Sequence, residues 1–282
     1  APVTGCDIAF CGDVPTGSGL SSSAALEVCT AATLLDMTNT RLPPLEVVSL
    51  CRRAENLFVG VNCGIMDQFA SYLCRKDHAL LINCKTLESE QIPLNLGTHT
   101  IVMVDTRKER KLASSAYNER VEQVARAAAF LRRYHPAIEL LGDATEEQVR
   151  AHADEMEPAI FRRALHVVTE IARVRETVFC LKSGDVPGAG AILYRSHDSL
   201  RDLYEVSCDE LDFVVNFCRQ FNGVAGARLT GGGFGGCVIV LIERSRIAEF
   251  AERLQPSYTA RFGHPAGFIG VESVDGAAAE SA

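Results

Sequence analysis

The stretch Val14–Met37 joins a flexible loop to the start of a helix, which is an arrangement that binds anions. Pro15 and two glycines precede the serines Ser21–Ser23, and apolar residues then recur at helical spacing. Serine often caps a helix, but no Glu or Gln stands three residues after any of these serines, so no capping box is predicted. The first N–H groups and the positive end of the helix dipole should therefore face the loop, where a phosphate is a natural partner. A glycine–serine turn before an ordinary core helix explains this stretch about equally well.

The loop differs from the two commonest nucleotide-binding loops. Gly12 and Gly17 have the spacing of a P-loop, but Ser18 and Gly19 stand where Lys and Ser or Thr are required. The string GSGLSS also lacks the third glycine of the dinucleotide-binding fingerprint. The pattern P-x-G-x-G-L-S-S-S-A that is left predicts a phosphate loop of another kind.

Two carboxylates further along the chain could do chemistry at a bound phosphate. Asp67 follows a glycine loop in CGIMDQF and either complements a helix dipole or assists an attacking hydroxyl in phosphoryl transfer. Glu55 is either a solvated helix carboxylate or a ligand of Mg²⁺. The hydroxyl of Ser23 would make a sensible second ligand, because hard cations prefer oxygen.

A second glycine-rich segment, Gly231–Gly236, has five glycines in six positions. A hairpin turn needs only one or two, so this segment predicts a backbone that comes close to a ligand or to another loop. The histidines are dispersed and lack metal-binding spacing, and we interpret His166 and His197 as surface or helix-packing residues.

The pattern of short strands and longer helices lacks a strict βαβ alternation, which favours an α+β fold. Strands are expected at Ile8–Cys11, Ala79–Cys84, Ile101–Asp105 and Phe268–Glu272, and on both sides of the glycine-rich segment within Gly223–Glu243. Helices are expected after Ser21, at Leu45–Leu57, from near Asp67, at 114–133, 158–182 and 198–221, and at Arg246–Leu254. The polar residues 85–98 predict a boundary between domains at 1–97 and 98–282, and the tail after Gly276 is expected to be disordered.

Composition narrows the class of protein. A net charge of −8 argues against a nucleic-acid surface, and 47% hydrophobic residues suffice for packed cores. No apolar run approaches the roughly 18 residues of a membrane span, and no signal peptide is visible. The eleven cysteines are odd in number and form no C-x-x-C pair, which favours reduced thiols in a cytoplasmic protein.

The loop VPTGSGLSSSAALE resembles the phosphate loop of the GHMP kinases, a family that includes galactokinase, homoserine kinase and mevalonate kinase. The strings CGIMDQFAS, DTRKERKLASSAYNER, YRSHDSLRDLYEVSCDELD and RLTGGGFGGC narrow the resemblance to the galactokinases, from about Cys6 to Val274. The resemblance implies an α+β, two-domain GHMP kinase fold. In this expected fold, a truncated N-terminal domain is followed by a ferredoxin-like C-terminal domain that has a helical layer.

The resemblance also implies the reaction, which is transfer of the γ-phosphate of MgATP to O1 of galactose. By position, Asp67 matches the catalytic aspartate, and Ser23 and Glu55 match the magnesium ligands. The sugar-binding positions are Cys63, Gly64, Asp67 and Tyr117. The positions that bind the ATP phosphates are Gly17, Ser18, Gly19, Leu20, Ser21, Ser22, Ser23, Gly231, Gly232 and Gly233, with the glycines up to Gly236 beside them. Three alternatives are an N-acetylgalactosamine kinase, a non-catalytic sugar and ATP sensor, and a truncated pseudo-enzyme.

Galactokinases also carry an upstream motif that reads approximately G-R-x-N-L-I-G-E-H-x-D-Y, and this sequence does not contain it. In the family the motif supplies an arginine that pairs with the catalytic aspartate, and a Glu, a His and an Asp that hold the sugar hydroxyls. We therefore expect the chain alone to phosphorylate galactose inefficiently. We also expect self-association or a complementing N-terminal segment to cover the edge of the strand at Ile8–Cys11. The other expected partners are galactose and ATP, with no nucleic acid and no membrane.

Overall fold

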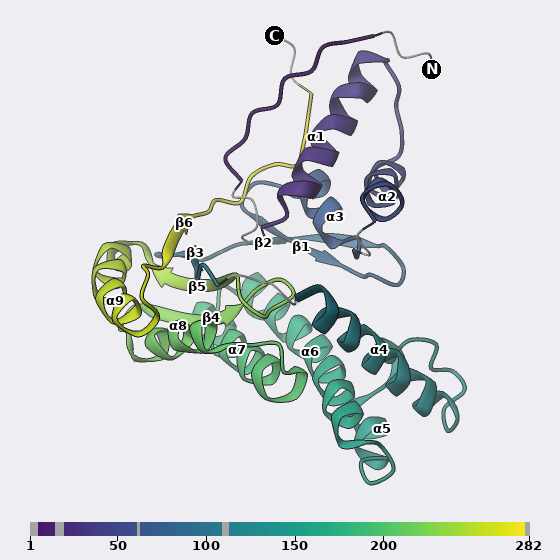
Figure 1. Cartoon of the computed structure of the whole chain (residues 1–282), viewed down its shortest axis with the longest axis vertical. Helices are drawn as coiled ribbons and strands as arrows, with labels where there is room; N and C mark the ends of the chain where they lie inside the picture. Colours follow the sequence, from purple (N-terminus) through teal and green to yellow (C-terminus); the bar gives the residue numbers. More distant parts are fainter. Residues whose placement is uncertain (1–4, 15–19, 61–62, 109–112, 280–282) are drawn as a thin grey trace. The chain divides into compact units, whose positions relative to one another are not determined.

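The computed structural model describes residues 5–14, 20–60, 63–108 and 113–279 (Figure 1). It divides into two compact units, one formed by Ala1–Leu94 with Glu272–Ala282 and the other by Asn95–Val271. Each unit has its own hydrophobic cores. Within the described residues, none of the helices is both long enough and apolar enough to cross a lipid bilayer.

The first unit packs three helices and a hairpin together. Its elements are α1 (Ser22–Met37), α2 (Pro44–Ala54), the π-helical turn η1 (Glu55–Val59), α3 (Met66–Leu73), β1 (His78–Ile82) and β2 (Ser89–Pro93). The antiparallel hairpin pairs His78 with Pro93 and Ile82 with Ser89. A core of Val28, Val47 and Cys51 joins α1 to α2, and a core of Val48, Ile65 and Phe69 joins α2 to α3.

The sequence of α2 explains its start and its orientation. Pro44 opens the helix, where its missing N–H costs nothing and its fixed φ suits the first turn. Val47, Val48 and Cys51 share one face at helical spacing, and all three are buried. The helix runs directly into η1, so the chain from Pro44 to Val59 is one continuous helical segment.

One sequence expectation for the first unit is wrong, and one of its strands was not expected. Residues 8–11 form no strand, and Ile8 and Phe10 are 42% and 57% exposed, because no described strand pairs with this segment. Residues 85–98, expected as a polar boundary, contain the strand β2. Only one side chain of this strand, that of Ile92, is buried. The sequence therefore lacks the alternation of apolar and polar residues that would predict a strand here.

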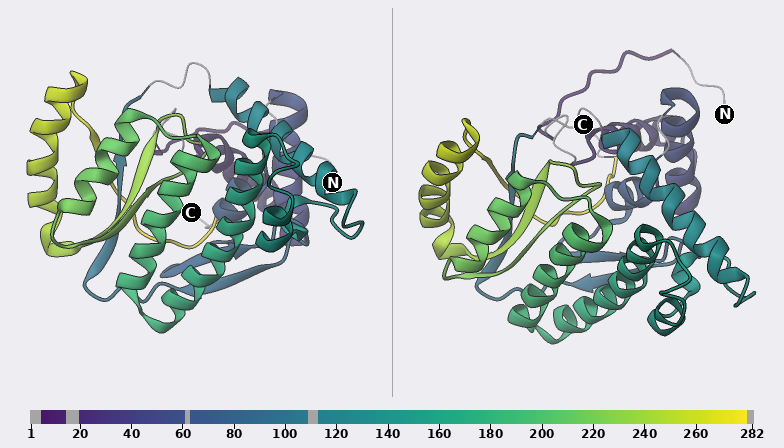
Figure 2. Two further views of the ribbon diagram at one scale, coloured as in Figure 1. Left: turned by 90° about the horizontal axis from the view of Figure 1, so that it is seen from below. Right: turned by 60° about the horizontal axis from the view of Figure 1, so that its bottom comes forward.

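The second unit is built on an antiparallel sheet with the strand order β4-β5-β3-β6. The strands are β3 (His99–Asp105), β4 (Val224–Leu229), β5 (Cys237–Glu243) and β6 (Gly267–Gly270). The helices are α4 (Ala113–Arg132), α5 (Glu146–Ala151), α6 (Pro158–Ser183), α7 (Val186–Ser199), α8 (Asp209–Gln220) and α9 (Ile247–Phe262), with shorter turns at η2 (Leu141–Asp143), η3 (Leu200–Tyr204) and η4 (Arg244–Arg246). Figure 2 shows green helices of this unit beside its light-green strands.

The two largest hydrophobic cores of the second unit lie on the sheet and in the helical layer. The larger one packs α8 and α9 onto the sheet, with Leu211, Val214, Phe250 and Tyr258 almost completely buried. The smaller one joins α4, α5 and α6, and is formed by residues that include Leu131, Ile138, Val149 and Ile160. The sheet and the helical layer are therefore stabilised separately by burial of apolar surface.

Helix α7 lies unusually close to the edge strand β4. A Cβ atom added at Gly226 would lie 2.2 Å from the carbonyl oxygen of Gly190, and one added at Gly190 would lie 2.1 Å from the carbonyl oxygen of Ala225. Only glycine fits at either position, so the close contact of α7 with β4 is specified by these two residues.

Two further expectations need correction. The single helix expected at 198–221 is interrupted, because η3 ends at Glu205 in the left-handed region (φ 56°) before α8 begins at Asp209. The described part of the tail, up to residue 279, is also not separate from the fold. The amide of Gly276 donates to Cys74 O (2.7 Å), that of Ala277 donates to Ser71 O (2.9 Å), and the segment belongs to the first unit.

Candidate active site

The N-terminus of α1 lacks a side-chain cap. Ser21 adopts the left-handed conformation (φ 59°, ψ 44°) and its side chain caps nothing, while the amide of Ala25 donates to its carbonyl oxygen (3.1 Å). No acidic residue stands in the first turn, which begins with Ser22 and Ser23. Within its first turn, the positive end of the helix dipole therefore meets no acidic side chain, as an anion site requires. Leu20 is half-buried before this turn, whereas Gly17, Ser18 and Gly19 lie outside the described residues.

Three elements of the first unit bring polar side chains to one buried cluster. Glu55 comes from η1, Glu27 from α1 and Gln68 from α3, and Gln68 Nε2 donates to Glu27 Oε2 (3.2 Å). Burial, followed by a hydrogen bond with Glu55, raises the pKa of Glu27 to about 7. Two carboxyl groups in contact favour a shared proton or a bound cation, because two adjacent negative charges repel each other.

The carboxyl cluster suits a divalent cation that also binds phosphate. Glu55 is 6% exposed, and its Oε2 atom has no hydrogen-bond partner among the described residues, which is costly for a buried carboxylate. No group of three or more His, Cys, Asp or Glu residues in the described ranges could hold a metal ion by itself. Mg²⁺ usually takes one or two carboxylates and completes its shell with phosphate oxygens and water. Glu55 with Glu27 has that character, while Ser23 stands exposed in the first turn of α1.

Asp67 lies in the first turn of α3, where the sequence places it. The turn is fixed because Ile65 and Phe69 are buried on either side of it and the amide of Phe69 donates to Ile65 O (3.1 Å). The side chain of Asp67 is half-buried and makes no hydrogen bond or ion pair with another described residue. A carboxylate held on a rigid helix without a partner is free to accept a hydrogen bond from a bound hydroxyl.

The residues just before Asp67 are tied to the carboxyl cluster. Asn56 Oδ1 accepts from the amide of Cys63 (3.1 Å) and from its thiol (3.3 Å). Gln68 Nε2 lies 3.9 Å from Cys63 Sγ. Gly64 is exposed, and a Cβ atom there would meet nothing within 4 Å. The structure thus brings Glu55, Cys63 and α3 together through Asn56 and Gln68.

The second unit contains the glycine loop, residues Thr230–Gly236, which connects β4 to β5. Four of its glycines have positive φ, from 72° at Gly231 to 127° at Gly235, and Phe234 also has positive φ (59°). A Cβ atom at Gly233 would lie 2.2 Å from Val206 O, so no side chain fits there. One at Gly232 would lie 3.7 Å from Cδ2 of Tyr117, so the loop places two of the expected site residues side by side.

Thr106, directly after β3, and Tyr258 of α9 hold the C-terminal end of the glycine loop. The hydroxyl and the amide of Thr106 both donate to Gly236 O, at 2.7 and 3.0 Å. The hydroxyl of Tyr258 in turn donates to Thr106 O (2.7 Å), and all three groups are buried. The exit from the loop into β5 is therefore rigid.

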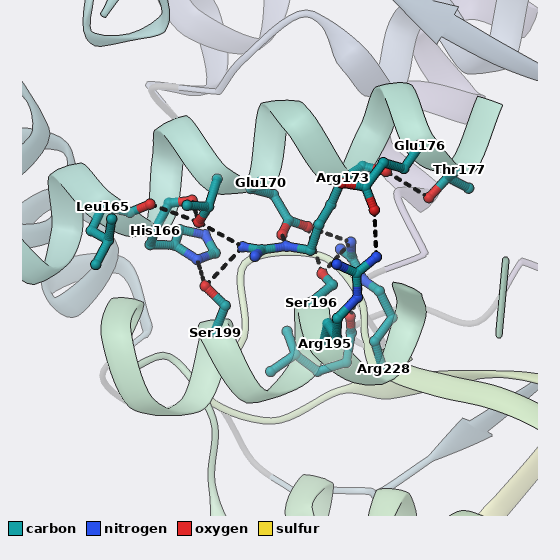
Figure 3. A network of polar contacts seen from close by, with 12 residues as sticks. Leu165, His166, Glu170, Arg173, Glu176, Thr177, Arg195, Ser196, Ser199 and Arg228 are labelled. Carbon is teal, nitrogen blue, oxygen red and sulfur yellow. Dashed lines mark hydrogen bonds and ion pairs between the residues drawn. The ribbon is translucent and has the colours of Figure 1, made fainter. Parts of the chain in front are cut away.

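A polar network between α6, α7 and β4 holds the other end of the loop (Figure 3). Glu170 accepts from Ser196, from Arg173 Nε (2.6 Å) and from Arg228 Nη1 (3.0 Å). Burial acts to raise the pKa of Glu170, but these hydrogen bonds and charges outweigh it and lower the pKa below its usual range. Arg228 Nε also donates to Leu229 O (2.9 Å), directly before the loop.

His197 completes this anchor. Its Nδ1 atom accepts from the amide of Leu229 (3.3 Å), and its Nε2 atom donates to Asp212 Oδ1 (3.1 Å). The side chain is 1% exposed. His197 is therefore a packing residue between α7, α8 and the end of β4. This agrees with the helix-packing role that was one of the two roles expected from the sequence.

Glu27 and Gln68 were not identified from the sequence, although Glu27 carried a usable signal. It stands three residues after Ala24 and one before Val28, both buried, so it belongs to the apolar face of α1. A carboxylate on a buried helix face requires a partner or a ligand. Gln68 directly follows Asp67 and gave no comparable signal.

Comparison with known proteins bears on the family of the chain. Residues 1–75 match the GHMP kinases N terminal domain, and residues 179–259 match the GHMP kinases C terminal domain. The galactokinase of Thermotoga petrophila is 42% identical over 95% of this chain and 74% of its own length. The galactokinase of Clostridium acetobutylicum is 41% identical over 97% of this chain and 70% of its own length.

The chain belongs to the galactokinase family.

A solved structure of the family supports the same assignment. The galactokinase of Lactococcus lactis, crystallised with galactose, superposes with a TM-score of 0.89 at 37% identity, over 94% of this chain and 68% of that one. A mevalonate kinase with a TM-score of 0.59 at 22% identity shares the fold. The expected α+β, two-domain GHMP kinase fold is therefore confirmed, and ATP is the phosphoryl donor that the galactokinase family implies.

Proposed function

We propose that this protein, a member of the galactokinase family, transfers the γ-phosphate of MgATP to O1 of galactose. The observation that carries the proposal is the likeness of nearly the whole chain to a galactokinase solved with galactose. Phosphoryl transfer requires mainly positioning and electrostatic stabilisation, and the described residues offer groups of both kinds.

Asp67 is the proposed catalytic residue. Its carboxylate, which has no partner among the described residues, would accept the hydrogen bond of the O1 hydroxyl and assist the loss of its proton as the oxygen attacks phosphorus. Its rigid place in the first turn of α3 limits the entropy that must be lost to align it. Cys63, Gly64 and Tyr117 are proposed to line the sugar site.

The N-terminus of α1 and the glycine loop are proposed to hold the phosphates. Leu20 and Ser21–Ser23 would present backbone N–H groups at an uncompensated helix end, together with Gly17–Gly19. Gly231–Gly233 would bring backbone against the phosphates without side-chain bulk. Glu55 and Ser23 would hold Mg²⁺, which when bound neutralises phosphate charge.

Galactose is favoured over N-acetylgalactosamine because the relatives that are 40–42% identical are galactokinases. The same relationship argues against a non-catalytic sensor. So does the presence of Asp67, whose carboxylate has no partner in the part of the chain that the structure describes. A cytoplasmic location is proposed together with the function. Association with a second copy or with a complementing segment stays a prediction, which sedimentation of the purified protein tests.

The test of the proposed function is product identification. The protein is incubated with MgATP and either galactose or N-acetylgalactosamine, and phosphorus NMR is used to identify the sugar 1-phosphate. Galactose 1-phosphate should form, with a higher kcat/KM for galactose. A higher kcat/KM for N-acetylgalactosamine, or nucleotide binding without any phosphoryl transfer, would overturn the proposal.

A further inference from the structure

The centre of the glycine loop contacts a carbonyl group from another part of the chain. The amide of Phe234 donates to Val206 O (2.7 Å). The same oxygen is the atom nearest to a Cβ atom added at Gly233, at 2.2 Å. Val206 is 2% exposed, so water cannot easily replace this contact. The position of Val206 therefore sets the position of the loop at its centre.

Val206 follows a turn in a conformation that the backbone does not prefer. Glu205 has a φ of 56°, in the left-handed region that non-glycine residues adopt only at a cost. It ends the π-helical turn η3, and carbonyl groups at the end of a helix lack partners within the helix. Other groups must therefore hold this turn in place.

Two buried arginines supply those groups. Arg163 Nη1 donates to Leu203 O (2.5 Å), Arg120 Nε donates to Tyr204 O (2.8 Å), and Arg120 Nη2 donates to Glu205 O (3.0 Å). The two arginines thus donate hydrogen bonds to three successive carbonyl oxygens, those of residues 203 to 205. Arg120 and Arg163 are 8% and 2% exposed and come from α4 and α6.

The side chain of Glu205 closes the same arrangement. Its carboxylate accepts from Arg163 Nη2 (2.7 Å) and from Arg162 Nη2 (2.8 Å). The hydrogen bond from Arg163 is the main reason why the pKa of Glu205 falls to about 2. The left-handed residue is therefore fixed by both its backbone and its side chain.

We infer that Arg120 and Arg163 are positioning residues for the glycine loop. They act through the Glu205 turn and the carbonyl of Val206, which fixes the amide of Phe234 and the backbone around Gly233. The inference rests on the proposed role of this loop at the nucleotide phosphates. Removing either arginine should let the turn relax and should weaken nucleotide binding without unfolding the sheet.

The test compares Arg120→Gln and Arg163→Gln with the wild-type protein. Hydrogen exchange measures the amide of Phe234, and calorimetry measures the Kd of a non-hydrolysable ATP analogue with Mg²⁺. Each variant should speed exchange at Phe234 and raise the Kd about tenfold, the scale of one hydrogen bond from a charged donor. Exchange in β3 should not change. Arg163→Lys, which keeps one charged donor, should restore part of both effects.

Arg126→Gln is the matched control, because Arg126 also lies on α4 but pairs with exposed Glu157 (2.6 Å) away from the turn. It should leave both measurements at wild-type values. If Arg163→Gln does not fold, Glu205→Gly replaces it, since glycine tolerates the left-handed backbone while the carboxylate is lost.

Unchanged exchange at Phe234, or faster exchange with an unchanged Kd, would overturn the inference. A wild-type protein that fails to bind the analogue, while its Phe234 exchange still depends on the arginines, would overturn the proposed function instead. The two failures are therefore distinguishable.

Discussion

Asp67 combines a rigid backbone with a carboxylate that has no partner among the described residues. We predict that Asp67→Asn lowers kcat for galactose by at least about 100-fold, the scale for losing a positioned base or an electrostatic partner. Galactose and nucleotide should still bind, because the amide keeps the shape of the side chain. Steady-state kinetics and calorimetry on the same preparation measure the two effects.

Glu46→Gln is the control for this variant. Glu46 also stands in the first turn of a helix, α2, and is exposed, so it shares the helix-dipole role without the proposed chemistry. Its loss should leave turnover unchanged. Near-normal turnover in Asp67→Asn would mean that Asp67 serves only its helix.

A buried histidine gives the protein a pH-dependent stability. His166 stacks on Tyr204 with ring centroids 4.5 Å apart, and its Nδ1 atom lies 2.8 Å from Ser199 Oγ. Burial is the main reason why the pKa of His166 falls to about 4. The charge of Glu170 acts to raise this pKa, and the charges of Arg173 and Arg228 act to lower it. The folded protein therefore binds this proton less well than the unfolded chain does, whose histidine has a pKa near 6.5.

The neutral, buried His166 stabilises the fold above pH 6.5, and this stabilisation is lost as the pH falls toward 4. The free energy of unfolding should fall by up to about 3 kcal/mol over this range. We predict that His166→Asn flattens the pH dependence between pH 6.5 and 4. Urea unfolding across this range measures it, and His264→Asn, outside the network of Figure 3, should keep the wild-type slope. Equal slopes in His166→Asn and the wild type would contradict the prediction.

At the scale of elements, the bare N-terminus of α1 gives the sharpest test of the phosphate site. We predict that Ser22→Asp weakens binding of MgATP strongly, because it places a negative charge where the helix dipole should attract one. Calorimetric titration measures the Kd. Ser89→Asp adds the same charge at the exposed start of β2 and should not change it. Equal affinity in Ser22→Asp and wild type would remove the site from this helix.

Elements with a strong local pattern could be predicted from the sequence. Helix α4, the two strands around the glycine loop and the first turn at Asp67 all follow from the spacing of apolar residues and from the positions of the glycines. Residues 8–11 were predicted wrongly, because an apolar run does not reveal whether a partner strand exists. The break at Glu205 was also missed, since distant arginines stabilise that backbone and no local residue type marks it.

The candidate site divides in the same way. The glycine loop and the serines of α1 are visible because their chemistry is local. Glu27 and Arg163 act through contacts with residues 28 and 42 positions away, which only the folded chain brings together. Local pattern thus predicts the groups that meet a ligand better than the groups that hold them in place.

At the scale of the whole molecule, the chain returns to its first unit after completing the second. Ser273 Oγ donates to His78 O (2.8 Å), and Asp275 Oδ1 accepts from the amide of Lys76 (2.9 Å). A Cβ atom at Gly276 would lie 2.2 Å from Tyr72 O. The last described residues therefore pack against the end of α3, the helix that carries Asp67.

This return makes the first unit sensitive to a residue far from it in sequence. We predict that Gly276→Ala speeds hydrogen exchange in α3 and β1, because the added methyl group must displace the segment from Tyr72 O. Exchange in β3 and β5 of the second unit should stay at the wild-type rate. Val274→Ala, which shortens a 60% exposed side chain in the same segment, is the control and should change neither unit. Faster exchange in both units of Gly276→Ala would show that the segment does not belong to the first unit alone, and unchanged exchange in α3 would show that its packing contributes nothing there.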